Sequence, residues 1–418
     1  MRLFRIIFAG GLIAFIATNF PLGIAGVYAR FPLIALMLAG CVMLTERVRF
    51  TGMSGMLMAL YGFLVYSFVT SFWTENIWLS LIRWLLYVTV CLAFFISGSI
   101  VGQNCKPDVN PFDSLKWVFL PLLVSSLLAI ARGIGWQDGN FRGFSGNSNA
   151  LGASIMFCTP WLLYELKRSW NTKWRKRGLV VLGVFTSFVM LATHSRAALG
   201  SFVLLILFAG LQLKLGRKLV LAYAGLLLLI AIYAIRPSAF DFIYHSYVNK
   251  RADTILASRG EQMEDSWEAA REGGVFGAGI GVSVGISQYW EFTTLSRISR
   301  EKGNSFLAIV EETGLVGLSF YVAMLLGMFM ALRKYGRTLD PETKFVANIA
   351  MGYFLASLLH GQFEAWFLSF GPDVSVYWGT IGLAMGYLAR KNTEYERNTR
   401  VEAATGARVF VPAPVSRG

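Results

Sequence analysis

The sequence predicts an all-α polytopic membrane protein of about twelve transmembrane helices, with one long loop on the outer face. Of its 418 residues 55% are hydrophobic and 15% are charged, and the mean hydropathy is +0.55. Soluble domains carry about 25% charged residues. Long apolar runs recur along the whole chain, each long enough to cross a bilayer. Because these runs lack the polar face of an amphipathic helix, a soluble fold is disfavoured.

The apolar runs define twelve expected spans. They lie near residues 4–19, 29–45, 52–72, 78–101, 115–131, 149–166, 178–194, 197–213, 219–235, 305–332, 344–360 and 373–389. With the N-terminus inside, 25 of the 38 Lys and Arg residues fall on inner segments and 12 on outer segments. Eight of those 12 lie in the long loop, which can translocate regardless of its charge. The short loops therefore place both termini in the cytoplasm.

The net charge of +14 would suggest nucleic acid in a soluble chain. Here the positive-inside rule explains it, so no nucleic-acid partner is expected. The basic run at residues 167–177 is interpreted as a topology determinant that touches anionic lipid. The four cysteines are scattered, which indicates neither a disulfide framework nor a metal site. No cleavable signal peptide is evident, and the first span is expected to direct insertion.

Four parts follow from this pattern. They are an N-terminal bundle (1–235), a large outer loop with helices (236–304), a C-terminal bundle (305–389) and a polar cytoplasmic tail (390–418) that is predicted to be disordered. The loop carries nine carboxylates besides its cations and aromatic residues, far more than a connection between two helices needs. It is therefore the first place to look for chemistry or recognition.

Polar motifs gather on the predicted outer face in a fixed order. A glycine- and asparagine-rich loop (Gly143–Asn149) precedes one span, and Ser195–Arg196 stands at the outer end of another. The long loop contains Arg259, followed eight residues later by Trp267 and then by a Gly-x-Gly-x-Gly turn (Gly277–Gly281). Asn304–Gly317 reads Asn-Ser-x-Leu and continues to Glu-x-Gly-x-x-Gly at the start of the tenth span.

This ordered set resembles the Wzy-type polymerase and O-antigen ligase superfamily of bacterial surface-glycan enzymes. The resemblance implies a GT-C-like glycosyltransferase that uses an undecaprenyl-diphosphate-linked oligosaccharide in the periplasm. It also implies that neither a cofactor nor a metal is needed. An enzyme of this kind must stabilise the negative charge that develops on the departing diphosphate. Arg196 and Arg259 take that role in the resemblance, because a guanidinium binds phosphate oxygens bidentately.

Each arginine has an alternative interpretation. In the alternative for Arg259, this residue is a solvated loop charge that pairs with Glu261 or Glu264. In the alternative for Arg196, the side chain extends to lipid headgroups. The sequence also departs from the ligase pattern at Gly303, where ligases usually carry a histidine before the asparagine. A glycine cannot act as a general base. Glu301, His245, Glu364 and His360 are the possible substitutes, unless stabilisation of the leaving group suffices.

The remaining candidate residues are expected to bind the substrate or to position other groups of the site. Asn304 and Asn149 are expected to orient polar groups or cap helices, and Glu364 to lie near the acceptor beside Trp366, on which a sugar ring could stack. The expected substrate-binding residues are Asn149, Asn147, Arg142, Trp267, Lys302, Arg300 and His194. For Trp267, Tyr289 and Trp290, a place in the interfacial aromatic belt is at least as plausible as sugar stacking.

Three further features have structural alternatives. Glu311 and Glu312 lie about two turns into the tenth span, where a carboxylate is either functional or paired with a cation. Arg83 is expected either to contact a lipid phosphate or to form a buried ion pair. The glycines of residues 277–281 do not indicate a dinucleotide fold, because no βαβ unit surrounds them. A tight turn that returns the loop to the membrane is expected there.

The sequence thus predicts an inner-membrane glycosyltransferase that acts on the periplasmic side. Its expected partners are the lipid-linked donor, an acceptor glycan (lipid-linked glycan or lipid A–core), membrane lipids, and a chain-length regulator or polysaccharide export protein. The Lys-Gly-Asn-Ser sequence with a downstream Glu-Ala-Trp favours an exopolysaccharide polymerase over a ligase. The rivals are a flippase or other transporter and a non-enzymatic scaffold. A flippase should carry charged residues along a cavity in both halves of the chain.

Overall fold

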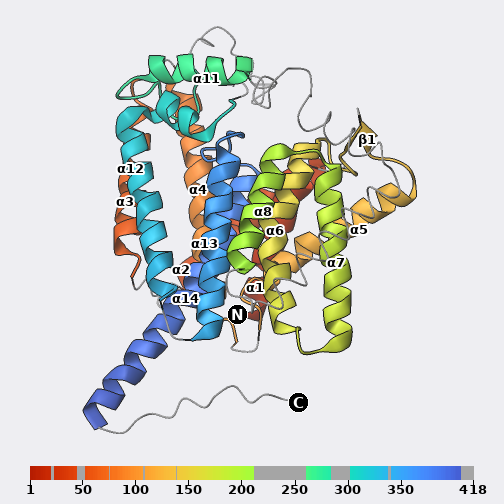
Figure 1. The fold of residues 1–418 in the computed structure, drawn as a ribbon. Helices are drawn as coiled ribbons and strands as arrows, with labels where there is room; N and C mark the ends of the chain where they lie inside the picture. The colour runs from red at the N-terminus through yellow and green to blue at the C-terminus, as the bar shows by residue number, and fades with distance from the viewer. Residues whose placement is uncertain are drawn as a thin grey trace.

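The chain forms a bundle of long helices in a computed structural model that describes residues 1–19, 23–44, 52–74, 76–106, 109–137, 139–210, 260–283, 302–337 and 340–405 (Figure 1). The bundle helices are α1 (Arg2–Ala17), α2 (Gly23–Leu44), α3 (Ser54–Thr70), α4 (Ile77–Gln103), α5 (Lys116–Ala131), α6 (Ser148–Arg168), α7 (Lys173–Ala192), α8 (Arg196–Gly210), α12 (Ser305–Tyr335), α13 (Pro341–Gly361) and α14 (Pro372–Thr405). A short 3-10 turn (Asp113–Leu115) precedes α5, and a hairpin of β1 (Trp136–Gln137) and β2 (Asn140–Phe141) follows it.

The helices coincide with eleven of the twelve expected spans, and the ninth expected span (219–235) lies outside the described residues. Four described helical segments are long and apolar enough to cross a membrane: Gly26–Leu44, Ile77–Gln103, Asp113–Ala131 and Ser305–Tyr335. Two further apolar helices, Ser54–Thr70 and Arg196–Gly210, are shorter. An all-α membrane protein is thereby supported, while the count of twelve spans and their orientation stay predictions.

The centre of the bundle is a close pairing of α4 with α14. Glycines on both helices allow their backbones to touch. A Cβ atom at Gly98 would stand 2.5 Å from the carbonyl oxygen of Gly379, and one at Gly382 would stand 2.4 Å from that of Phe95. Small residues at such a contact let membrane helices approach closely and gain dispersion energy. This seam fixes the position of α14 and of the turn that precedes it.

One end of the bundle is covered by α11 (Gly260–Gly273), a helix of the long loop that lies across the start of α12 (Figure 1). We call this end of the bundle the α11 end. The helices α6, α8, α12 and α14 begin there. At the opposite end Lys167 donates to the carbonyl oxygen of Pro341 (3.1 Å). Tyr164 and Tyr387 both donate to one carboxylate oxygen of Glu342 (2.5 and 3.1 Å). These contacts join α6, α13 and α14 at that end.

The C-terminal tail differs from its prediction. Disorder was expected from Arg390, but α14 continues as a helix to Thr405. Arg390 and Lys391 lie 3.5 and 3.7 Å from the Glu394 carboxylate, and Asn392 donates to Glu396 at 2.8 Å. Side chains three and four residues apart are neighbours on a helix, and such pairs stabilise it. The remaining residues, 406–418, lie outside the described part of the chain.

Candidate functional site

Asn304 ties the start of α12 to the turn between α13 and α14. Its side-chain oxygen accepts from the backbone N–H groups of Phe306 (2.7 Å) and Leu307 (3.1 Å), which makes it the N-cap of the helix. Its amide nitrogen donates to both the backbone and the side-chain oxygen of Gln362, each at 3.0 Å. With 6% of its surface exposed, Asn304 is held by both helices.

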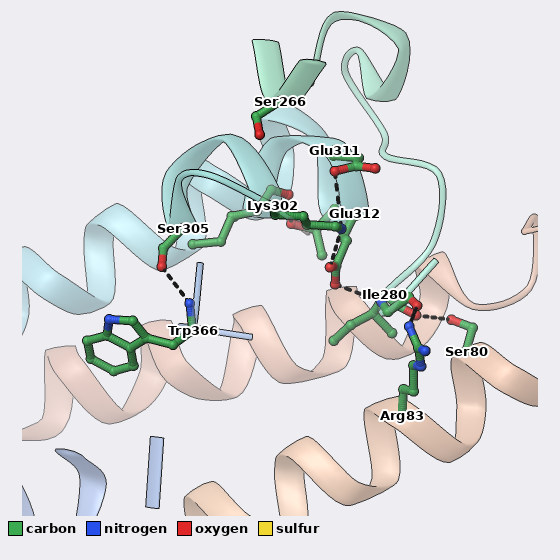
Figure 2. Close-up of polar contacts among 12 residues, drawn as sticks. Ser80, Arg83, Ser266, Ile280, Lys302, Ser305, Glu311, Glu312 and Trp366 are labelled. Carbon is green, nitrogen blue, oxygen red and sulfur yellow. Dashed lines mark hydrogen bonds and ion pairs between the residues drawn. The ribbon is translucent and has the colours of Figure 1, made fainter. Parts of the chain in front are cut away.

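Ser305 makes a second link to the same turn. Its hydroxyl donates to the carbonyl oxygen of Glu364 (2.7 Å) and accepts from the N–H of Trp366 (2.9 Å) (Figure 2). Glu364 is half-buried, and one of its carboxylate oxygens accepts from the Asn149 amide at 3.2 Å. Asn149 stands at the start of α6, where Asn147 is the N-cap and accepts from the N–H of Asn149 at 2.8 Å. Residues from three distant parts of the sequence thus form one connected network.

Arg196 begins α8 next to this network. Gly152 on α6 allows the close approach, since a Cβ atom there would stand 3.0 Å from Ala198 Cβ and 3.3 Å from Ser195 Cβ. Arg196 is half-buried. The starts of α6, α8 and α12 therefore gather at the α11 end. Helix N-termini carry partial positive charge and exposed N–H groups, so this gathering favours an anionic ligand.

His194 and Arg142 lie on the loops that flank these helix starts. The Nδ1 atom of His194 lies 3.1 Å from Asn140 Oδ1, and His194 is buried with a positive φ of 50°. Arg142 donates to the side-chain oxygen of Gln137 within the β1–β2 hairpin.

A pocket of about 650 Å³ opens beside Asn304, beneath α11. Apolar side chains of α11, α12 and the α13–α14 turn form most of its wall, and Glu264, Asn304 and Gln362 supply polar groups. Trp267 lines it with 56% of its surface exposed, which leaves its indole accessible. Gly260, which follows Arg259 in the sequence, also lines the pocket. Ligand pockets commonly combine apolar walls with a few converging polar groups.

Position 303 is crowded by α11. Its N–H donates to the buried Ser266 hydroxyl at 3.0 Å. A Cβ atom at Gly303 would stand 3.2 Å from the carbonyl oxygen of Gln262. The glycine found where ligases usually carry a histidine therefore allows α11 to pack directly on the start of α12.

Lys302 lies in a buried ion triad rather than open to the pocket. Its ammonium group stands 3.1 Å from Glu311 and 2.6 Å from Glu312, and 9% of its side chain is exposed (Figure 2). The second oxygen of Glu312 accepts from the N–H of Gly281 (2.7 Å), whose carbonyl oxygen accepts from Arg83. The sequence left the partner of these carboxylates open. The structure gives Lys302, so the paired interpretation fits their surroundings.

The glycine-rich segment 277–281 is a tight turn, as expected. Gly277, Gly279 and Gly281 all have positive φ angles, a conformation that L side chains rarely adopt. The turn lies against α12 where that helix breaks at Gly314 (φ 68°). The backbone groups freed by the break pair with the turn: Ala278 N–H with the Glu311 carbonyl at 2.9 Å, for example. Such pairing is needed wherever irregular backbone lies in a membrane protein.

Two candidate residues at the turn between α13 and α14 are enclosed by other side chains. Trp366 is 4% exposed and packs against Phe157, Phe367 and Tyr377. A sugar ring has no open face there, which corrects the expected stacking on Trp366. His360 is 1% exposed, and its ring centroid lies 5.8 Å from that of Phe157. It is therefore shielded from an acceptor at the pocket.

Several predicted residues lie outside the described part of the chain: Arg259, Glu301, Arg300, His245, Tyr289 and Trp290. Sequence reasoning in turn did not single out Ser305, Gln362 or Gly152. Ser305 had a signal, since it follows the capping Asn304 in the Asn-Ser motif; Gln362 and Gly152 had none. Among the described residues no three His, Cys, Asp or Glu side chains lie close enough together to hold a metal ion.

Comparison with known proteins bears on this site. The family model described as O-antigen ligase matches residues 181–322, roughly a third of the chain. The matched segment runs from α7 into α12, so it includes Arg196, the long loop and Asn304, but not Asn149 or Glu364. A comparison with curated proteins gave no match. The family match confirms the resemblance that the ordered motifs predicted: residues 181–322 match the O-antigen ligase model, which supports the Wzy-type polymerase and O-antigen ligase superfamily.

Proposed function

We propose that this protein is a membrane glycosyltransferase that moves an oligosaccharide from an undecaprenyl diphosphate to an acceptor glycan. The observation that carries the proposal is the gathering of three helix starts, with Arg196 at one of them, around the Asn304–Glu364 network and its adjoining pocket. The α11 end is then the periplasmic end. The family match supports an activity of this class.

Stabilisation of the leaving diphosphate comes first. Cleavage of the bond between the anomeric carbon and the phosphate oxygen leaves the electron pair, and hence negative charge, on the diphosphate. The guanidinium of Arg196, at the positive start of α8, offers charge-assisted hydrogen bonds to that group. The resemblance assigns Arg259 the same role. We propose that these two cations replace the metal ion that many phosphate-releasing enzymes use.

Activation of the acceptor comes second. As the acceptor hydroxyl oxygen bonds to the anomeric carbon, its proton must pass to a base within hydrogen-bond reach. Glu364 suits this task among the described candidates, because its carboxylate is half-buried and is oriented by Asn149. We assign Glu364 as the base and Asn149 as the residue that positions it. Direct displacement of this kind inverts the configuration at the anomeric carbon.

The pocket gives the glycan a place to bind. The exposed indole of Trp267 offers an apolar face to a sugar ring, and Glu264 and Gln362 offer acceptors and a donor to its hydroxyls. Asn304 lines the pocket and anchors the network, so it couples glycan binding to the position of Glu364.

Reconstitution of the full chain in liposomes with a lipid-diphosphate-linked donor tests the proposal. Two acceptors are offered separately, a second lipid-linked glycan and lipid A–core. We expect a longer lipid-linked polymer with the first, since the Lys-Gly-Asn-Ser sequence favours a polymerase. Transfer only to lipid A–core would identify a ligase instead. Translocation of the donor without any product would indicate a flippase and contradict the proposal.

Three variants assign the roles within that assay. Arg196→Ala should lower the transfer rate about 10²- to 10³-fold, the usual loss for one charge-stabilising donor. Glu364→Gln keeps the shape but removes the base, and a loss of about 10²- to 10⁴-fold is expected. Arg132→Ala is the matched control, because Arg132 is an exposed cation at the end of α5, outside the network. Equal losses in the control and in Arg196→Ala would reject a specific role for Arg196.

A further inference from the structure

A second cavity, of about 560 Å³, lies at the opposite end of the bundle from α11. It is bounded by α1, the end of α4 and the segment that leads into α5. Three of its lining side chains, Arg2, Arg5 and Lys116, are cations, and Asp113 is the one carboxylate among the described lining residues. The proposed transfer reaction uses none of these residues.

The charge of the cavity is unbalanced. Asp113 is already engaged, since both its oxygens accept from the Lys116 ammonium at 2.8 Å. Arg5 donates from one terminal nitrogen to the carbonyl oxygen of Asn104, but its buried Nε atom has no hydrogen-bond partner among the described residues. Arg2 is exposed at the mouth. A guanidinium in such a place favours an anion with several acceptor oxygens, such as a phosphate.

The wall of the cavity that α1 forms is apolar beyond its two arginines. On α1 its wall continues from Arg2 and Arg5 through Ile6, Ala9, Gly10 and Ile13, one stripe at helical spacing. At 1.5 Å per residue, that stripe extends about 16 Å from the charged mouth into the bundle. Ile6 and Ile13 are exposed, so the groove is open towards the surrounding lipid.

The opposite wall combines polar residues, among them Asn110 and Ser114, with apolar ones. Lys116 and Asp113 stand at its charged end, and the exposed indole of Trp117 stands beside them. Val101 and Val109 extend the apolar surface. Tryptophan is enriched at the level of lipid headgroups, where its ring is half in the apolar phase. The two walls together match a molecule with an anionic head and a hydrocarbon tail.

We infer that this groove binds one anionic glycerophospholipid of the membrane. Its phosphate lies against Arg2 and Arg5, and one acyl chain lies along the Ile6–Ile13 face of α1. Basic pockets between transmembrane helices on the cytoplasmic side are known to suit such headgroups. The site is independent of the transfer reaction, because the start of α1, which lines it, lies at the end of the bundle away from α11 (Figure 1).

Native mass spectrometry of the delipidated full chain tests the inference. Phosphatidylglycerol is titrated as the anionic lipid, phosphatidylcholine as the zwitterionic lipid, and glycerol 3-phosphate as the head without a tail. We expect one tightly bound phosphatidylglycerol and much weaker binding of the other two. Equal binding of phosphatidylcholine would overturn the charge argument. Equal binding of glycerol 3-phosphate would overturn the acyl-chain argument.

Charge variants locate the bound lipid. Each cation near a lipid phosphate contributes about a fivefold gain in affinity, so the Arg2→Gln, Arg5→Gln double variant should bind phosphatidylglycerol about 30-fold more weakly. Arg2→Gln alone, on an exposed side chain, should cost about fivefold and serves if the double variant misfolds. The matched control is Arg333→Gln, Lys334→Gln, two exposed cations at the end of α12. The same loss in this control as in the double variant would overturn the assignment to the groove.

Discussion

Removal of the Asn304 side chain should remove hydrogen bonds that hold the start of α12 against the α13–α14 turn. Asn304→Ala deletes the N-cap of α12, which costs about 1 kcal/mol, and two hydrogen bonds to Gln362 at about 1 kcal/mol each. The expected loss is therefore about 3 kcal/mol. Because the turn carries Glu364, transferase activity should fall as well, even though Asn304 is not assigned a proton-transfer role.

Asn304→Asp separates the two contributions. The carboxylate keeps an acceptor for the N–H groups of Phe306 and Leu307, and negative charge at a helix start is favourable. The new carboxylate, however, cannot donate a hydrogen bond to Gln362, and it lies against the two oxygens of Gln362 that the amide of Asn304 contacted. We expect thermal unfolding of Asn304→Asp to lie between those of the wild type and Asn304→Ala, with activity reduced in both variants. An Asn304→Asp protein as active as the wild type would refute the coupling between this amide and Glu364.

Three further predictions concern the surroundings of the site. Lys302→Met should destabilise the protein by about 3–5 kcal/mol in unfolding measurements, because it removes the cation that the two buried carboxylates share. Gly303→His should lower activity rather than supply a base, since a side chain there displaces α11; a gain in transfer rate would contradict this packing argument. Asp340 caps α13: burial would raise its pKa, but hydrogen bonds from the first turn outweigh burial and hold the pKa below its ordinary value. The folded state is thus favoured above the unfolded pKa of about 3.9, and Asp340→Ala should cost about 1 kcal/mol in unfolding at neutral pH, a difference that shrinks as the pH falls below that value.

Hydropathy predicted the helices because membrane spans must be apolar along their whole length, and each apolar run in the described residues became a helix. The tail was mispredicted because composition alone does not reveal the pairs of Glu394 with Arg390 and Lys391, which extend α14. Local sequence also predicted the cap at Asn304, since asparagine is favoured there.

The pairings across the bundle were beyond such reasoning. Lys302 was expected to bind substrate, and its burial depends on where the glycine turn and the break in α12 bring Glu311 and Glu312. Trp366 reads as an exposed aromatic of an outer turn, and its enclosure depends on Phe157 of α6. In both cases the deciding partner is brought in by tertiary packing, which no local pattern encodes.

The long loop acts on the site through backbone contacts as well as through its side chains. Residues 274–279 pair with residues 311–316 where α12 breaks: Leu315 N–H donates to the Gly274 carbonyl (3.1 Å) and Gly279 N–H to that of Glu312 (3.0 Å). A Cβ atom at Gly314 would stand 2.2 Å from the Val275 carbonyl oxygen, so no other residue fits that contact without movement. The part of α12 that precedes the break begins at its N-cap, Asn304. The loop therefore sets the position of Asn304, and through Ser305 that of Glu364, so changes in the glycine turn should alter transfer without touching the substrate.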